Sequence, residues 1–178
     1  IATKKITFFD APISGGEAGA INGTLSVMLG GGNKNSLIVR KLIKTFAKNI
    51  VHVGPNGHGQ LTKMINQICI AGLLQALSEA LSFGIQKKLD MNKVLDAISQ
   101  GAAQSWQMEN RAETMVANKF NFGFAIDLMI KDLKIALIEA NTLGLRLDVT
   151  KDVLKKYKKL SDKGYGSLDT SSLIKLLK

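Results

Sequence analysis

The chain has 178 residues, 46% of them hydrophobic, so it can bury a sizeable core. A single cysteine permits no internal disulfide, and with only two histidines besides it we predict no metal site. The net charge of +10 leaves open a function in binding an anionic partner.

The first third of the chain alternates between strand-like and helix-like patterns. Runs rich in β-branched and aromatic residues predict strands at 6–9, 24–29 and 50–53, and apolar periodicity predicts a helix over 35–47. Three glycines at 30–32 follow the second strand at a spacing that does not fit a pyrophosphate-binding turn, so we interpret them as a strand-end turn.

From Gly59 onward the pattern is helical, and no proline interrupts it. Glycines and capping side chains predict where the helices begin and end. The predicted helices run from 60 to 87 or 88, from a cap at Asp90 or Asn92 to before Gly101, over 106–117 behind a Ser105 cap, over 125–143, from Asp148 to before Gly164, and from Asp169 onward.

The most informative run is 54–67, in which three glycines allow a tight turn into the long helix. Lys63 lies in the first turns of that helix, and Asn66 and Gln67 follow three and four residues later, so all three share one helical face. Lysines near helix starts are usually solvated, but this helix is apolar around most of its circumference, which predicts a buried helix with Cys69 as an inert core thiol. Because a buried lysine and two amides need partners or a ligand, we interpret them as one wall of an active site.

A second constellation, Ser14-Gly15-Gly16, offers a hydroxyl donor and two backbone amides that no side chain obstructs. Such an arrangement can hold a carboxylate or a phosphate. The same three residues also occur in ordinary turns, so alone they leave both interpretations open.

Residues 10–25 read Asp-Ala-Pro-x-Ser-Gly-Gly-x-x-Gly-Ala-x-x-Gly-Thr-Leu, and this pattern resembles the β-hydroxyacid dehydrogenase family. The family includes 3-hydroxyisobutyrate dehydrogenase, tartronate semialdehyde reductase, glyoxylate and succinic semialdehyde reductases and, more distantly, 6-phosphogluconate dehydrogenase. The resemblance continues through 28–31, 57–63, 131–133 and 169–174, so it covers essentially the whole chain.

The resemblance implies an oxidoreductase that transfers a hydride between NAD or NADP and a small β-hydroxy acid or its semialdehyde. Hydride arriving at a carbonyl carbon leaves negative charge on oxygen, and a positioned ammonium stabilises that charge and supplies a proton, which contributes about a hundredfold to ten-thousandfold in rate. Lys63 would therefore be the general acid in reduction and the general base in oxidation.

The other site residues follow from the same resemblance. Ser14, Gly15 and Gly16 would hold the substrate carboxylate. The family usually has an asparagine four residues after the lysine, where this chain has Gln67 preceded by Asn66, so the substrate contact falls to one of these two amides. The cofactor contacts would be Lys131, Asp132 beside it in the same cleft, and Phe124 near the nicotinamide ring.

By this resemblance the fold class is mainly α, with the last strands of a Rossmann-type α/β domain over 1–54 and a helical C-terminal dehydrogenase domain over 55–178 that begins with a long interdomain helix. The family binds its cofactor with a Gly-x-Gly-x-x-Gly turn, which this sequence lacks. We expect that turn to lie upstream of Ile1 in a longer protein, and residues 1–178 alone to be inactive. The open strand edges predict pairing with the missing half or another chain, and we expect a homo-oligomer.

A different class of function remains as the alternative, a basic helical module that binds nucleic acid or a protein. Residues 151–178 contain eight lysines and three aspartates. We prefer to interpret the lysines as a solvated face, because the whole chain has three arginines and few aromatics for base stacking. With no signal peptide or apolar run of membrane-spanning length apparent, we expect a cytoplasmic protein that does not enter a membrane.

Overall fold

The computed structural model describes residues 6–177. These residues form two compact units, and the division between them lies between Asn66 and Gln67. The parts of the predicted domains that fall on residues 1–5 and on Lys178 lie outside the described residues.

The first unit is built on a four-stranded sheet around β3 (Leu25–Gly31). The strands β1 (Phe9–Asp10) and β2 (Ile13–Ser14) pair antiparallel with successive parts of β3, and between them the Pro12 carbonyl accepts a hydrogen bond from Met28 N at 3.0 Å. The strand β4 (Ala47–Gly54) pairs with β3 in parallel. Since α2 (Asn33–Ile43) connects these two parallel strands, they form a β–α–β unit.

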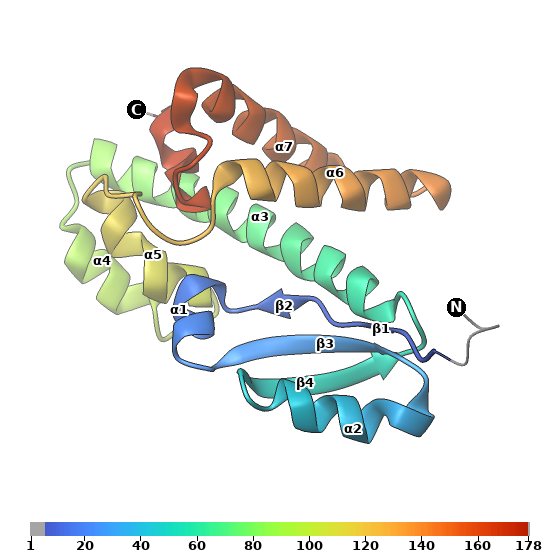
Figure 1. The fold of residues 1–178 in the computed structure, drawn as a ribbon. Coiled ribbons are helices and arrows are strands. Elements are labelled where there is room, and N and C mark those ends of the chain that lie inside the picture. Colours follow the sequence, from blue (N-terminus) through green and yellow to red (C-terminus); the bar gives the residue numbers. More distant parts are fainter. Residues whose placement is uncertain (1–5, 178) are drawn as a thin grey trace. The chain divides into compact units, whose positions relative to one another are not determined.

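The core of this unit lies between α2 and the sheet, and Figure 1 shows α2 running along the strands. Several element boundaries differ from the prediction, and the strand predicted from residue 50 begins at Ala47. The helix predicted over 35–47 ends at Ile43, because Ala47 is already the first residue of β4 and is buried opposite Leu25. The strand predicted over 6–9 begins only at Phe9. The sequence reading also missed β2 and a six-residue helix, α1 (Gly16–Ile21).

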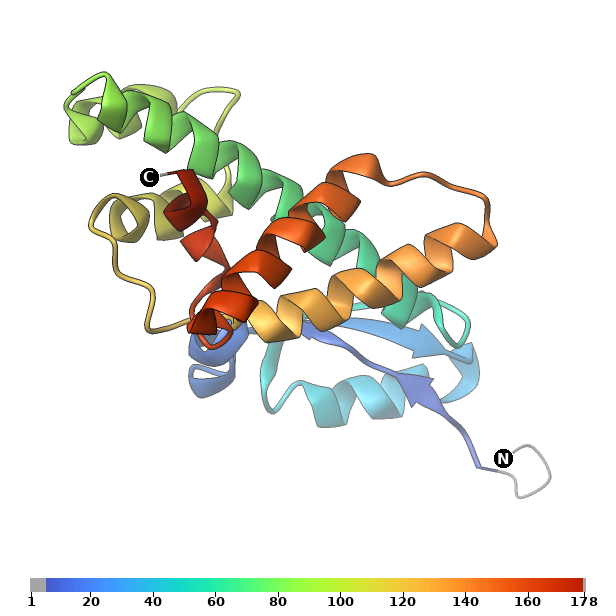
Figure 2. The same ribbon diagram turned by 90° about the horizontal axis from the view of Figure 1, so that it is seen from above.

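The second unit is helical, and its helices form two neighbouring cores. One core joins the long helix α3 (His58–Gln86) to α6 (Ile126–Thr142) and α7 (Asp148–Leu160), with Tyr157 fully buried in it. Figures 1 and 2 both show α6 and α7 side by side. The other core joins α3 to α4 (Met91–Ile98), α5 (Trp106–Val116) and the terminal 3₁₀ helix η3 (Thr170–Leu177).

The predicted helix ends in this unit agree well with the structure because local capping determines them. Asp90 caps α4 by accepting hydrogen bonds from Asn92 N and Lys93 N, and Ser105 caps α5 by accepting one from Met108 N. After α7 a short π-helical turn, η2 (Ser161–Tyr165), follows, and it contains Gly164 at φ 83°. Only glycine adopts that backbone angle readily, so the predicted stop near Gly164 has a conformational cause.

The long helix α3 is less buried than its composition predicted. Its outer face carries exposed apolar residues, including Leu73 and Phe83, and Cys69 is exposed, so the prediction of a core thiol is wrong. Apolar residues occur all around this helix, but only the face bearing Ala71 and Leu74 packs against the bundle.

The expectation that no apolar run of membrane-spanning length occurs is also wrong. Among the described residues, α3 alone is long and apolar enough to cross a bilayer by length and composition. A core helix can satisfy the same criterion of length and composition, and α3 has one face buried in the helical unit.

Candidate active site

Ser14, Gly15 and Gly16 lie at the end of β2, where the chain turns into α1. Ser14 is half-buried and pairs with Ser26 of β3, which fixes its backbone to the sheet. Gly15 has φ 129° and Gly16 has φ 62°, both in the region that favours glycine. A Cβ on Gly16 would meet no atom within 4 Å, so the space beside this exposed backbone is open to a small ligand. The two glycines therefore have a conformational role in addition to any binding role.

The start of α3 is attached to the sheet through Asp10, at the end of β1. The buried Asp10 carboxylate accepts hydrogen bonds from Gly57 N at 2.7 Å through Oδ1 and from Gln60 N at 3.0 Å through Oδ2. Gly57 is the residue just before α3 and Gln60 lies in its first turn, where backbone donors lack intrahelical partners and a negative charge is favourable. Asp10 thus connects the run that contains Ser14 to the run that contains Lys63.

Lys63, Asn66 and Gln67 follow on α3, as predicted, and their spacing puts them on one face of that helix. Lys63 and Asn66 are half-buried, whereas Gln67 has 2% of its surface exposed.

Gln67 of α3 and the successive α6 residues Lys131 and Asp132 form a connected polar group. Gln67 Nε2 donates to Asp132 Oδ2 at 2.6 Å, and Lys131 Nζ forms an ion pair with Asp132 Oδ1 at 2.9 Å. The Lys131 side chain is 63% exposed and that of Asp132 only 14%. The result is an oriented carboxylate beneath an accessible ammonium, and this arrangement fits a polar group of a dinucleotide.

Phe124 precedes α6 and is fixed at its backbone by Asp169. Asp169 Oδ2 accepts a hydrogen bond from Phe124 N at 2.9 Å, and the Phe124 carbonyl accepts one from Thr170 N at 2.9 Å. The ring is half-buried against the core of α3, α6 and α7. A half-buried aromatic ring of this kind can pack against a planar cofactor ring.

Asp169 itself is the centre of a buried network that joins three segments. Its Oδ1 accepts from Arg111 Nε at 3.2 Å, from Ser171 N at 3.0 Å and from Ser171 Oγ at 2.6 Å. The Arg111 guanidinium lies 5.0 Å from the ring centroids of both Trp106 and Phe122.

The charge of Asp169 also acts on a neighbouring phenol. Burial raises the pKa of Tyr157 well above its usual value, and the negative charge of Asp169 raises it further. The Tyr157 hydroxyl donates to the Thr170 carbonyl at 3.2 Å.

Sequence reasoning did not identify Asp10 and Arg111 and assigned Asp169 only as a helix cap. A signal for Asp10 was present, since it is an acidic residue in an otherwise apolar strand. Its hydrogen-bond partners lie 47 and 50 residues away along the chain, and a local sequence pattern cannot predict contacts over such separations.

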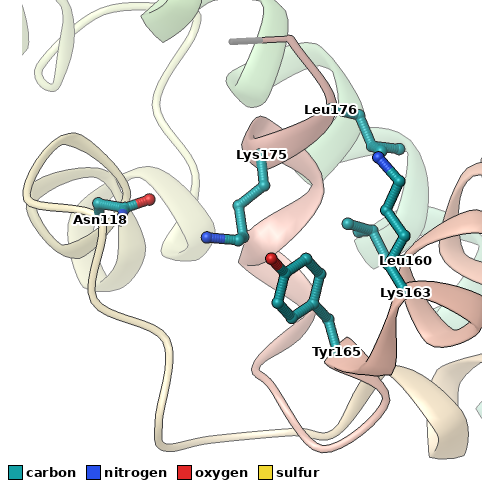
Figure 3. A pocket seen from close by; sticks show the side chains of 6 residues that line it. All are labelled: Asn118, Leu160, Lys163, Tyr165, Lys175 and Leu176. Carbon is teal, nitrogen blue, oxygen red and sulfur yellow. The ribbon is translucent and has the colours of Figure 1, made fainter.

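A hollow of about 300 Å³ in the helical unit contains none of the predicted site residues. In Figure 3 Lys175 extends toward Asn118, and its ammonium lies 5.0 Å from the centroid of the Tyr165 ring. The hollow is lined by Asn118, Leu160, Lys163, Tyr165, Lys175 and Leu176. Across residues 6–177, no three histidine, cysteine or acidic side chains gather closely enough to hold a metal ion.

The sequence matches two family models, and both describe NAD-binding domains of dehydrogenases. Residues 57–177 match the NAD-binding domain of NADP-dependent 3-hydroxyisobutyrate dehydrogenase, and residues 1–54 match the NAD-binding domain of 6-phosphogluconate dehydrogenase. The cofactor of this family is therefore NAD or NADP.

Similar proteins extend over nearly the whole chain. An uncharacterised oxidoreductase of Shewanella frigidimarina is 50% identical over 95% of the chain and 58% of its own length. The 2-hydroxy-3-oxopropionate reductase of Escherichia coli is 41% identical over 96% of the chain and 58% of its own length. The structure of Mycobacterium tuberculosis 3-hydroxyisobutyrate dehydrogenase with L-serine superposes with a TM-score of 0.88 at 28% identity, over 96% of the chain and 60% of that protein.

A helical unit of this form, preceded by a β–α–β unit, defines the class of NAD-binding dehydrogenases with a helical C-terminal domain. Within that class, the chain belongs to the 3-hydroxyisobutyrate dehydrogenase family. The predicted fold class and family are both confirmed. The chain spans about 58–60% of the length of these relatives.

Proposed function

We propose that the chain supplies the substrate site and the proton donor of an NAD(P)-dependent dehydrogenase that acts on a small β-hydroxy acid or its semialdehyde. The observation that carries this proposal is the attachment of the Lys63 helix to the strand that leads into Ser14-Gly15-Gly16, through Asp10. It ties a candidate acid–base group to a candidate carboxylate site within one compact unit.

Lys63 is the general acid and base of the proposed reaction. When bound, the nicotinamide cofactor supplies or accepts the hydride. In reduction the Lys63 ammonium donates its proton to the developing alkoxide, and in oxidation the neutral amine removes that proton. Asn66 or Gln67, on the same helical face, would orient the reacting hydroxyl.

Ser14, Gly15 and Gly16 would bind the substrate carboxylate through the hydroxyl and the backbone amides. Two relatives support a small carboxylate-bearing substrate, because one is a reductase of 2-hydroxy-3-oxopropionate and the other was solved with L-serine. Lys131, Asp132 and Phe124 are proposed to hold the cofactor, with the Lys131 ammonium toward its polar part and the Phe124 ring toward the nicotinamide.

We assign residues 1–54 to the dinucleotide-binding domain and 55–178 to the helical domain, a division that the ranges of the two family models support. In this assignment the pyrophosphate-binding turn comes from residues outside the present sequence, and residues 1–178 alone are inactive. A homo-oligomer is proposed because α3 and α6 expose apolar side chains, Leu73, Phe83 and Ile138 among them. A cytoplasmic location, away from membranes, is proposed from the single cysteine and the need for NAD(P).

The basic module remains the alternative, but contacts on α7 disfavour it. Two of its lysines are engaged in ion pairs, Lys155 with Asp152 at 3.0 Å and Lys156 with Glu79 at 3.6 Å, which is typical of a solvated helix face.

The test compares residues 1–178 with the complete enzyme that includes them. NADH and NADPH are titrated against both by fluorescence, and turnover is measured on a panel of short hydroxy acids and semialdehydes. We expect binding and turnover only in the complete enzyme, because the sequence of residues 1–178 contains no Gly-x-Gly-x-x-Gly turn, whose amides would hold the pyrophosphate. Absence of turnover on every substrate of the panel would contradict the proposed activity, and micromolar binding by residues 1–178 would contradict the proposed cofactor site.

A further inference from the structure

We propose that Asp10 is a positioning residue for the proposed reaction, which sets the place of the Lys63 ammonium relative to the carboxylate site at Ser14-Gly15-Gly16. This inference rests on the proposed function. Asp10 touches neither substrate nor cofactor in this proposal and acts through the helix that carries Lys63.

The first argument is the way that Asp10 completes the start of α3. Each of its two carboxylate oxygens accepts a hydrogen bond from a different amide at the helix start, Gly57 N just before α3 and Gln60 N in its first turn. A helix usually takes such a cap from the residue just before it, whereas this one takes it from a strand that lies 47 and 50 residues earlier. The position of the helix start therefore depends on the position of β1.

The second argument is the absence of free space around the carboxylate. A Cβ on Gly30 would lie 2.5 Å from Asp10 Oδ1, and one on Gly59 would lie 2.7 Å from Asp10 Oδ2 and would also contact the Met28 carbonyl. Only glycine at these two positions lets β1, β3 and α3 approach so closely. Asp10, which is 7% exposed, is thus held between the central strand and the helix with little freedom to move.

The third argument is the short path from Asp10 to both proposed functional groups. Ser14 follows Asp10 by four residues, and their strands, β2 and β1, both pair with β3. Lys63 follows Gln60 by three residues, less than one helical turn. A misplacement of about 1 Å between reacting groups can lower a rate by about a hundredfold. A contact that fixes the relative position of the two groups therefore affects turnover more than cofactor binding.

The experiment introduces Asp10→Asn and Asp10→Ser into the complete enzyme. Asparagine keeps one acceptor oxygen but presents an NH₂ group to the other backbone amide. Serine keeps a single acceptor oxygen, on a shorter side chain. We expect kcat to fall on the order of tenfold to a hundredfold, while the KM for NAD(P)H changes less than about threefold. Asp90→Asn is the matched control, because Asp90 also caps a helix through two backbone amides but lies outside the Lys63 run, and its kcat should equal that of the wild type.

A double-mutant cycle with Lys63→Ala separates positioning from simple loss of folded protein. If Asp10 acts through Lys63, Asp10→Asn lowers kcat no further in the Lys63→Ala background. A wild-type kcat in Asp10→Asn, an equal fold-loss in both backgrounds, or failure of both Asp10 variants to fold would overturn the proposal. Full activity of Lys63→Ala alone would instead overturn the proposed function, so the two failures are distinguishable.

Discussion

Replacement of Asp169 by asparagine tests the buried network at the end of the helical unit. The substitution keeps the shape of the side chain but removes its charge, and the new NH₂ group replaces Oδ2, which accepts from Phe124 N, or Oδ1, which accepts from Arg111 and Ser171. Either orientation leaves a buried donor without an acceptor and the Arg111 guanidinium, 18% exposed, without its counter-charge.

Breaking a buried ion pair from one side costs about 3–5 kcal/mol, and the slight exposure of Arg111 places the expected loss of unfolding free energy near about 3 kcal/mol. A loss of that size lowers the melting temperature on the order of 10 °C. Thermal and urea unfolding can be followed by the fluorescence of Trp106, which lies against Arg111. Asp152→Asn is the control, because the Asp152–Lys155 pair is exposed on α7. Equal melting temperatures for the two variants would refute the reasoning.

Three further predictions concern single side chains. Because the pKa of Tyr157 is raised above 10.0, its phenol contributes stability that is present below pH 10 and is lost as pH rises further, by up to about 1.4 kcal/mol per pH unit. The unfolding free energy of Tyr157→Phe should therefore fall less steeply with pH between about 10 and 11 than that of the wild type or of Tyr165→Phe. Parallel slopes would contradict this prediction. Ser14→Ala should raise the KM for carboxylate-bearing substrates about tenfold at unchanged kcat, since its hydroxyl is proposed to bind the carboxylate in ground and transition states alike, and an unchanged KM would mean that the run is only a turn. Lys131→Ala should raise the KM for NAD(P)H about tenfold while Lys134→Ala, another exposed lysine of α6, leaves it unaltered, and equal values for both would exclude Lys131 as a cofactor contact.

The helical unit was predictable because local chemistry determines its helix ends. Asp90 and Ser105 cap their helices through amides two or three residues away, and Gly144 and Gly164 take positive φ values that end helices. Such contacts are visible in any short window of sequence. The order of β3, α2 and β4 in the first unit was also predictable from local pattern, since β3 and β4 have clear apolar patterns.

The parts that were missed depend on contacts between distant residues. The helix α1 contains two glycines in six residues, so its intrinsic propensity is low, and Gly19 packs against Leu25 of β3. The exposed face of α3 could not be distinguished from its buried face, because both are apolar. In the same way, Asp169 was recognised as a cap, but its pairing with Arg111 across 58 residues was not.

The central claim is that Lys63 is the acid–base group, and the most direct measurement is kcat of Lys63→Ala in the complete enzyme, with NAD(P)H binding measured in the same preparation. The account predicts that kcat falls by about a hundredfold to ten-thousandfold while the affinity for NAD(P)H is retained, because the proton donor is removed and the proposed cofactor contacts remain. Lys48→Ala, an exposed lysine of β4, should behave as the wild type. A kcat of Lys63→Ala close to that of Lys48→Ala would contradict the account.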